Sequence, residues 1–185
     1  MMKSVAKAAF RRISGRLTRF RRDRRGATAI EFAFLAIPFA MLSFAILETT
    51  ISFTAQQVLN NAADKIGRMY RTGQLTAAST DEAGFRNIVC GEISIIVGSG
   101  CPQLVIDFQN YDEFEDVPRE IPHESDGDID VSELKYDPGG AATINNIRLF
   151  YRWPVITDLM KPYMSNLPNN KTLLFASVTW QNEDF

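Results

Sequence analysis

An uninterrupted apolar segment near the N-terminus, from Ala27 to about Leu47, limits the possible folds of this chain more than any other feature. Its 21 residues include one charged side chain, Glu31, and they are enough to cross a bilayer as an α-helix at ~1.5 Å per residue. Residues 1–26 carry ten bases and one acid, a net charge of +9. Because a basic flank stays in the cytoplasm, we expect everything after residue 47 on the other side of the membrane.

A conventional secretory signal fits this segment less well. Such a signal has an apolar region of ~7–15 residues, followed by a cleavage site made of small residues. Here the apolar region is longer, and Glu48-Thr49-Thr50-Ile51-Ser52 follows it. Cleavage on the cytoplasmic side, before the apolar run, fits better, and an uncleaved signal anchor remains an alternative.

The long helix is expected to continue beyond the membrane. From Glu48 to Gly73 the pattern becomes amphipathic, and Gly73 is a plausible stop. The apolar stripe consists of Ile51, Ala55, Val58, Leu59, Ala62, Ile66, Met69 and Tyr70. The chain therefore divides into a basic leader (1–26), a transmembrane helix (27–47), an amphipathic extension of that helix (48–73) and an exported domain (74–185).

The exported domain is predicted to be α+β. A capping box at Ser79–Glu82 precedes a second helix that runs to about Val97. Alternating apolar residues predict strands at 103–110, 143–153 and 171–182, with a turn or two of helix at 155–163. In the second strand, Ile147, Leu149, Tyr151 and Trp153 share one face. We expect the long helix to pack on a small antiparallel sheet.

Residues 112–140 are expected to form a long acidic loop. Eleven acids fall between Asp112 and Asp137, and Pro118, Pro122 and Pro138 interrupt regular structure. The spacing of Asp126, Asp128, Asp130 and Asp137 resembles a calcium loop, but Val131 replaces the required glycine and the last ligand is not Glu. A solvated acidic loop is the better interpretation, and no metal site is predicted.

The two cysteines, Cys90 and Cys101, both lie on the exported side. An even pair in an oxidising compartment favours a disulfide. Metal binding is a poor alternative, because structural zinc takes four ligands and His123 is the only histidine.

No catalytic motif is found in the sequence. His123 lies in the acidic loop with no nucleophile motif beside it, so a surface histidine is expected rather than a general base. The aromatic run Phe150-Tyr151-Arg152-Trp153 could form a binding face, although core packing is the ordinary explanation. Residues 27–185 carry a net charge of −11 and no basic patch interleaved with aromatics, so nucleic-acid binding is not expected. The sequence has no Gly-rich phosphate loop and no metal-binding cluster, and no cofactor is expected.

The junction Arg24-Arg25-Gly26-Ala27-Thr28-Ala29-Ile30-Glu31-Phe32 resembles the prepilin processing site of type IV pilin-like proteins. It is most similar to the start of TadE-like proteins, the pseudopilins of the tight-adherence (Tad, Flp) pilus system. Later segments look like the same family: Arg71-Thr72-Gly73-Gln74, Phe85 to Cys90 with Cys101 following, Tyr111-Asp112-Glu113-Phe114, Asp137-Pro138-Gly139-Gly140, Tyr151-Arg152-Trp153-Pro154 and Gln181-Asn182-Glu183. Phe32 departs from the main pilin of the system, which has Tyr after the Glu.

The resemblance implies a non-enzymatic minor pilin of the bacterial inner membrane, with a cytoplasmic N-terminus and a periplasmic domain. A prepilin peptidase would cut between Gly26 and Ala27. Other pilins and pseudopilins, the inner-membrane assembly platform and the lipid bilayer would be its partners, and pilus biogenesis, surface adhesion and biofilm formation its role. Two alternatives stay open: a signal-anchored periplasmic ligand-binding or sensor domain that never assembles, and an anchored enzyme.

Glu31 is the residue that we expect to act in assembly if the protein is a minor pilin. An acid inside a membrane helix is costly, and it indicates function by default, although an acid near the bilayer edge can also snorkel to the headgroups. Cleavage after Gly26 would leave an ammonium group on Ala27. Glu31 could pair with that amine or with the amine of a neighbouring subunit, because opposite charges attract strongly at low dielectric.

Overall fold

The computed structural model describes residues 26–98 and 100–184 of the chain, which divides into two units, 1–43 and 44–185. One helix, α2 (Ala27–Arg71), has 45 residues, and Pro38 and Gly67 are the only helix-breaking residues inside it. Gly73 ends it with a φ of 71°, a left-handed conformation that glycine accepts without strain. The N–H groups of Gln74 and Leu75 then reach the carbonyl of Met69, at 2.9 and 3.1 Å, and close the last turn.

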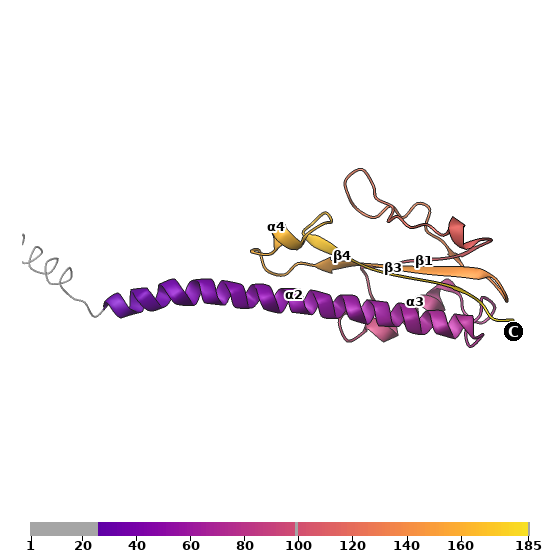
Figure 1. Cartoon of the computed structure of the whole chain (residues 1–185), viewed down its shortest axis with the longest axis horizontal. Helices are drawn as coiled ribbons and strands as arrows, with labels where there is room; N and C mark the ends of the chain where they lie inside the picture. Colours follow the sequence, from indigo (N-terminus) through magenta and orange to yellow (C-terminus); the bar gives the residue numbers. More distant parts are fainter. Residues whose placement is uncertain (1–25, 99, 185) are drawn as a thin grey trace, which may run out of the picture. The chain divides into compact units, whose positions relative to one another are not determined.

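The second unit contains a four-stranded sheet with the order β2-β1-β3-β4 (Figure 1). Three strands are antiparallel and start and end within one residue of the predicted bounds: β1 (Leu104–Tyr111), β3 (Ile144–Pro154) and β4 (Lys171–Gln181). The fourth, β2 (Tyr136–Asp137), pairs with β1 in parallel. The predicted α+β fold with a long helix is confirmed, and the three predicted strands pair antiparallel; the two-residue β2, which was not predicted, adds one parallel pair and makes the sheet mixed.

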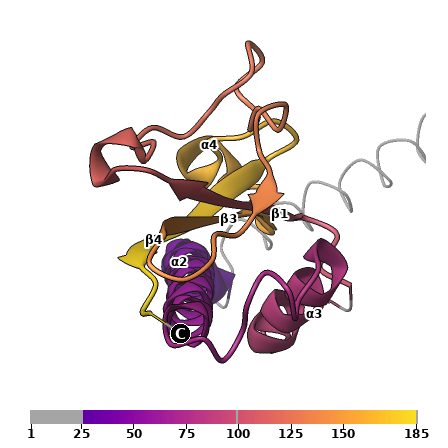
Figure 2. The ribbon, with the colours of Figure 1, turned by 90° about the vertical axis from the view of Figure 1, so that its right-hand side faces the viewer.

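Helices α2 and α3 (Glu82–Ile93) lie on the same side of the sheet (Figure 2). Asp81 caps α3 by accepting a hydrogen bond from the N–H of Gly84 at 2.8 Å. The apolar core lies between these helices and the sheet. Its largest fully buried members are Tyr70, Phe85, Phe108, Leu59, Ile66, Ile93, Ile147, Leu149 and Val89.

Close helix–sheet packing occurs at Gly67. A Cβ atom added to this residue would lie 3.2 Å from the ring of Trp180 and 3.3 Å from Val178. Glycine therefore lets α2 approach β4 closely. Tyr151 and Trp153 lie in the same core, which confirms core packing over a binding face for these two aromatic residues.

Two details of the helices differ from the sequence prediction. Ile51 was placed in the buried stripe, but it is 47% exposed, whereas Ser52 is buried. On this side of α2, Ile156 and Thr157 of the chain after β3 bind Glu48, one turn before Ser52. The second helix ends at Ile93 rather than Val97, and residues 94–96 continue only as turns.

β4 is an edge strand, and side chains occupy part of its outer edge. Gln56 on α2 donates from Nε2 to the carbonyl of Phe175 (2.8 Å) and accepts from the N–H of the same residue (3.2 Å). Asn166 accepts from the N–H of Leu173 at 2.8 Å. The helix and the preceding turn thus supply hydrogen bonds that a further strand would otherwise make.

Candidate functional site

The predicted processing site lies where α2 begins. Gly26 is exposed and directly precedes the first helical residue, Ala27. Glu31 is also exposed, one helical turn after Ala27. Residues 1–25 of the basic leader lie outside the described residues. Cleavage after Gly26 and pairing of Glu31 with the new amine stay predictions.

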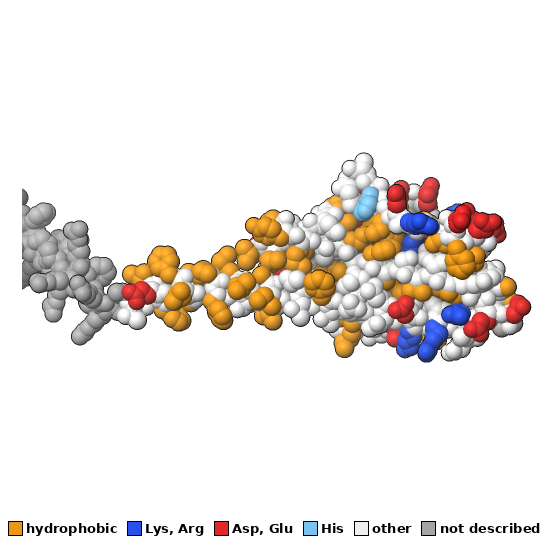
Figure 3. Space-filling view, in the orientation of Figure 1, with side chains coloured by type: hydrophobic (Ala, Val, Ile, Leu, Met, Phe, Trp, Pro, Cys, Tyr) orange, Lys and Arg blue, Asp and Glu red, His pale blue; other side chains and the backbone are white. Residues whose placement is uncertain are grey.

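Apolar side chains cover α2 from Ile30 to Leu47. Seven of them are at least 60% exposed: Ile30, Phe32, Phe34, Leu35, Ile37, Phe39 and Leu42. Figure 3 shows apolar side chains gathered along this part of the helix, whereas charged side chains lie mainly over the rest. Among the described residues, α2 is the one helix long and apolar enough to cross a membrane. An apolar surface of this extent needs lipid or other helices around it.

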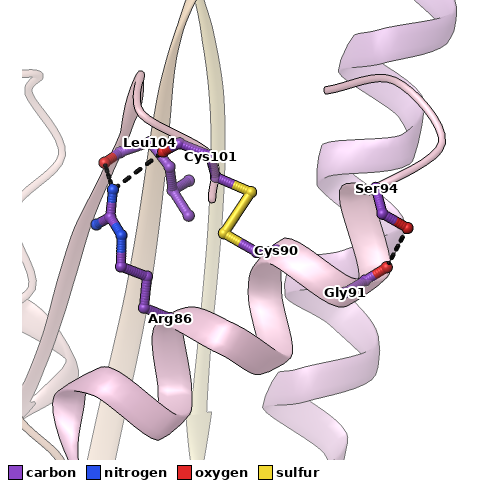
Figure 4. The surroundings of a disulfide bond; sticks show 6 residues. All are labelled: Arg86, Cys90, Gly91, Ser94, Cys101 and Leu104. Atoms are coloured by element: carbon purple, nitrogen blue, oxygen red, sulfur yellow. Dashed lines mark hydrogen bonds between the residues drawn. A yellow bond between two sulfur atoms is a disulfide. The ribbon is translucent and has the colours of Figure 1, made fainter. Parts of the chain in front are cut away.

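A disulfide joins Cys90 in α3 to Cys101, just before β1, with the Cα atoms 5.8 Å apart (Figure 4). Arg86, one turn earlier in α3, donates from Nη2 to the carbonyls of Cys101 and Leu104 at 3.0 and 2.9 Å. The disulfide and this guanidinium together fasten α3 to the start of β1. The sequence indicated the cysteine pair, but it did not indicate Arg86, because an arginine on a helix is ordinarily solvated.

The second face of the sheet carries a buried ion pair that the sequence analysis missed. Asp107 is fully buried, and its Oδ2 atom lies 2.7 Å from both Nε and Nη2 of Arg148. The other carboxylate oxygen accepts from the N–H of Lys135 (3.0 Å) and from Gln109 (2.7 Å). Arg148 also donates to the carbonyl of Glu120 at 3.2 Å. These bonds attach the acidic segment to the sheet.

Aromatic packing accompanies this pair. The rings of Phe150 and Phe175 lie 5.0 Å apart, and Phe150 is fully buried on the same face of β3 as Arg148. The acidic segment contains a short 3₁₀ helix, η2 (Phe114–Asp116), as well as the two-residue strand β2. Between this segment and β1 and β3 lies a polar cavity of about 810 Å³.

The four spaced aspartates are not brought together. Asp126 and Asp130 each accept a backbone N–H two residues ahead, at 2.9 and 2.8 Å. Asp128 lies 2.8 Å from Nε of Arg152, whose hydrogen bond holds the pKa of that carboxyl below its usual range. Asp137 belongs to β2. Within residues 26–98 and 100–184, no three His, Cys, Asp or Glu side chains form a group that could hold a metal.

His123 lies at the rim of the polar cavity. Its side chain is exposed, and its backbone forms an isolated bridge with Ile129. The surface location expected from the sequence is confirmed.

Glu48 is the other buried acid that sequence reasoning missed. It is 6% exposed, and it accepts hydrogen bonds from the N–H of Ile156 (2.5 Å), from the N–H of Thr157 (3.1 Å) and from the Thr157 hydroxyl. Three donors around one carboxylate offset its desolvation. The only signal in the sequence is its position, since Glu48 is the first charged residue after the apolar run.

Comparison with known proteins gives one match. Residues 26–68 match the family model described as TadE-like protein. No curated protein and no solved structure matches the chain. The matched residues begin at Gly26 and follow α2 almost to its end, so the resemblance noted in the sequence is confirmed over this helix. TadE-like proteins belong to the Tad pilus system, and the apolar helix fits a membrane-anchored protein of that kind.

Proposed function

We propose that this TadE-like protein is a pseudopilin, a minor pilin that supports biogenesis of a Tad pilus and through it surface adhesion and biofilm formation. A prepilin peptidase removes residues 1–26. The mature helix stays in the inner membrane beside other pilins and the assembly platform, and the domain that follows lies in the periplasm.

Three boundaries fall within one residue of the proposed cut between Gly26 and Ala27, and this agreement supports the proposal best. The family match begins at Gly26, the helix begins at Ala27, and the basic leader ends at Arg25. A glycine at the last leader position suits a peptidase pocket that has no room for a side chain.

Glu31 gives the proposal its mechanism. The new amine on Ala27 would be an isolated charge at the membrane boundary, where an unpaired charge is unfavourable. Glu31 lies four residues later and therefore on the same side of the helix. It neutralises its own amine or that of an adjacent subunit, and the second arrangement aligns subunits axially.

The first experiment is mass spectrometry of the mature N-terminus in cells with and without the peptidase. We expect a chain that starts at Ala27 only when the peptidase is present. Gly26→Leu should abolish the cut, while Gly15→Leu, a matched glycine inside the leader, should not. An intact N-terminus in peptidase-competent cells would refute processing.

A second experiment separates processing from assembly. Glu31→Gln keeps the shape and removes the charge, so it should leave the cut largely intact but impair pilus formation. Glu31→Asp should be partly competent. Asp64→Asn, which removes an exposed acid from the same helix, is the control and should have no effect. Normal assembly by Glu31→Gln would show that this acid only snorkels.

The polar cavity supports a second candidate, a signal-anchored periplasmic domain that binds a ligand or senses one. Tyr111, Lys135 and Arg148 line this space of about 810 Å³, within the usual range for small-molecule sites. This function does not require cleavage. An uncut chain that remains functional in cells lacking the peptidase would favour it over the pseudopilin.

A further inference from the structure

The segment 155–164, which contains the short helix α4 (Lys161–Met164), exposes apolar side chains. Ile156 is 68% exposed, Leu159 38% and Tyr163 80%. They lie close in sequence on one short connection between β3 and β4. Scattered apolar side chains on a surface need no explanation, but a group of three on a ten-residue segment indicates an interaction surface.

Hydrogen bonds to Glu48 determine where this segment lies along α2. The backbone N–H groups of Ile156 and Thr157 donate to that carboxylate. The apolar run ends one residue earlier, at Leu47. Its 21 residues span roughly 31 Å as a helix, close to the ~30 Å hydrocarbon thickness of a bilayer. Glu48 therefore lies at the boundary between the hydrocarbon and the headgroups.

The headgroup layer extends about 5–7 Å beyond that boundary, or about four residues of helix. Ile156 contacts Glu48 directly and lies within this layer. Further along the segment, Met164 lines a small cavity of about 210 Å³ together with Ser52 and Phe53 of α2. Segment 155–164 thus follows α2 through the depth at which the helix leaves the bilayer.

The polar groups at this level are compatible with lipid. The segment has no net charge, because Asp158 and Lys161 are opposite in sign and form an ion pair at 2.5 Å. It also covers Glu48, leaving that acid 6% exposed. On α2 itself, the hydroxyls of Thr49 and Thr50 donate to carbonyls one turn back, at 2.6 and 2.8 Å.

We infer that segment 155–164 is a second membrane contact, in which Ile156, Leu159 and Tyr163 enter the headgroup layer of the bilayer that α2 crosses. Tyrosine suits this depth, because its ring is apolar and its hydroxyl stays hydrated. Glu48 is the positioning residue that holds the segment there. The inference requires the membrane span of α2 but neither cleavage nor pilus assembly, so it stands or falls independently of the pseudopilin role.

The test measures the depth of position 163 in the full chain, reconstituted alone into phospholipid nanodiscs. The two native tryptophans, Trp153 and Trp180, are 8% and 7% exposed, and the unaltered protein supplies their background signal. Tyr163→Trp places an indole on the segment. Phe114→Trp is the matched control, because it replaces an aromatic residue that is 56% exposed on η2.

We expect lipids brominated near the carbonyl end of their acyl chains to quench most of the added emission of Tyr163→Trp, and aqueous iodide to have little effect. Phe114→Trp should show the reverse. Equal iodide quenching of the two variants would overturn the inference. So would protection of Tyr163→Trp from iodide only after other pilins are added, since that result would make the surface a protein contact.

Adding Glu48→Gln to Tyr163→Trp tests the positioning role. The amide of glutamine keeps one acceptor oxygen but places an NH2 group where the second oxygen accepted hydrogen bonds, so the segment should be held less tightly and the lipid quenching should fall toward the level of Phe114→Trp. Unchanged lipid quenching in the double variant would overturn the role assigned to Glu48. The native emission of Glu48→Gln alone reports whether the domain is still folded.

Discussion

Replacing Asp107 with asparagine should destabilise the domain far more than the same change at an exposed acid. Asp107 is fully buried, and Arg148 beside it has a side chain that is 6% exposed. Asparagine keeps the size but leaves the guanidinium charge unpaired in the interior. Breaking a buried pair in this way costs about 3–5 kcal/mol.

The matched control is Asp128→Asn. That carboxylate bonds Arg152 at 2.8 Å, but the two side chains are 31% and 19% exposed. Solvent-screened pairs contribute about 0–1 kcal/mol. The two variants make the same chemical change in different surroundings, so the difference between them isolates the effect of burial.

Urea unfolding of the full chain in detergent, followed by tryptophan emission, is a suitable assay. Both tryptophans are buried in the domain, so their emission reports the domain and not the membrane helix. With a slope of about 2 kcal/mol per M urea, Asp107→Asn should lower the midpoint by about 2 M and Asp128→Asn by under about 0.5 M.

A double variant completes the test. Asp107→Leu with Arg148→Met removes both charges and keeps apolar volume, so it should be much more stable than Asp107→Asn. A midpoint for Asp107→Asn within about 0.5 M of the Asp128→Asn value would refute the reasoning. The reasoning would also be refuted if the double variant lost as much stability as the single variants Asp107→Leu and Arg148→Met lose together, because the effects of substitutions at residues in contact are not additive.

Three further predictions use the same assay. The pKa of Asp128 is lowered in the folded state, so its stabilisation is complete above the unfolded pKa of about 3.9 and is lost as the pH falls through the folded pKa. The unaltered domain should therefore lose more stability than Asp128→Asn between about pH 5 and pH 2, and parallel pH profiles would contradict this. Gly67→Val should lower the free energy of unfolding by about 1–3 kcal/mol, because the added side chain overpacks against Trp180. Gly91→Ala should raise it by about 0.5–1 kcal/mol, because Gly91 lies in α3 with nothing within 4 Å of an added Cβ atom. Reducing the disulfide should cost about 2–3 kcal/mol, and an unchanged midpoint would show that the crosslink contributes nothing.

One face of the sheet could be predicted from the sequence, and the other could not. Ile147, Leu149, Tyr151 and Trp153 alternate strictly, so both the strand and its buried face follow from the period of two. The opposite face holds Arg148 and Phe150, and the pattern of the strand does not show that this face is buried. It is buried because residues 112–135 fold over it, and a covering segment without a regular period leaves no pattern in the sequence.

A pairwise signal was nonetheless present. Asp107 and Arg148 are opposite charges on adjacent strands, and the register places them directly across from each other. Phe150 and Phe175 are likewise register partners. The residue pattern of a single strand cannot show these cross-strand pairs, because they appear only when the register between two strands is known. Glu48 was missed for a similar reason, since its donors lie 108 and 109 residues later in the chain.

The hydrogen bonds of the Gln56 amide affect how neighbouring copies of the protein can contact one another. Anchored chains are confined to two dimensions and meet one another often, and free strand edges are where β-proteins join irreversibly. Gln56 engages both backbone groups of Phe175, and Asn166 engages Leu173. Along this stretch the edge of the sheet offers no free template for a neighbour's strand, which disfavours sheet-to-sheet association of crowded chains.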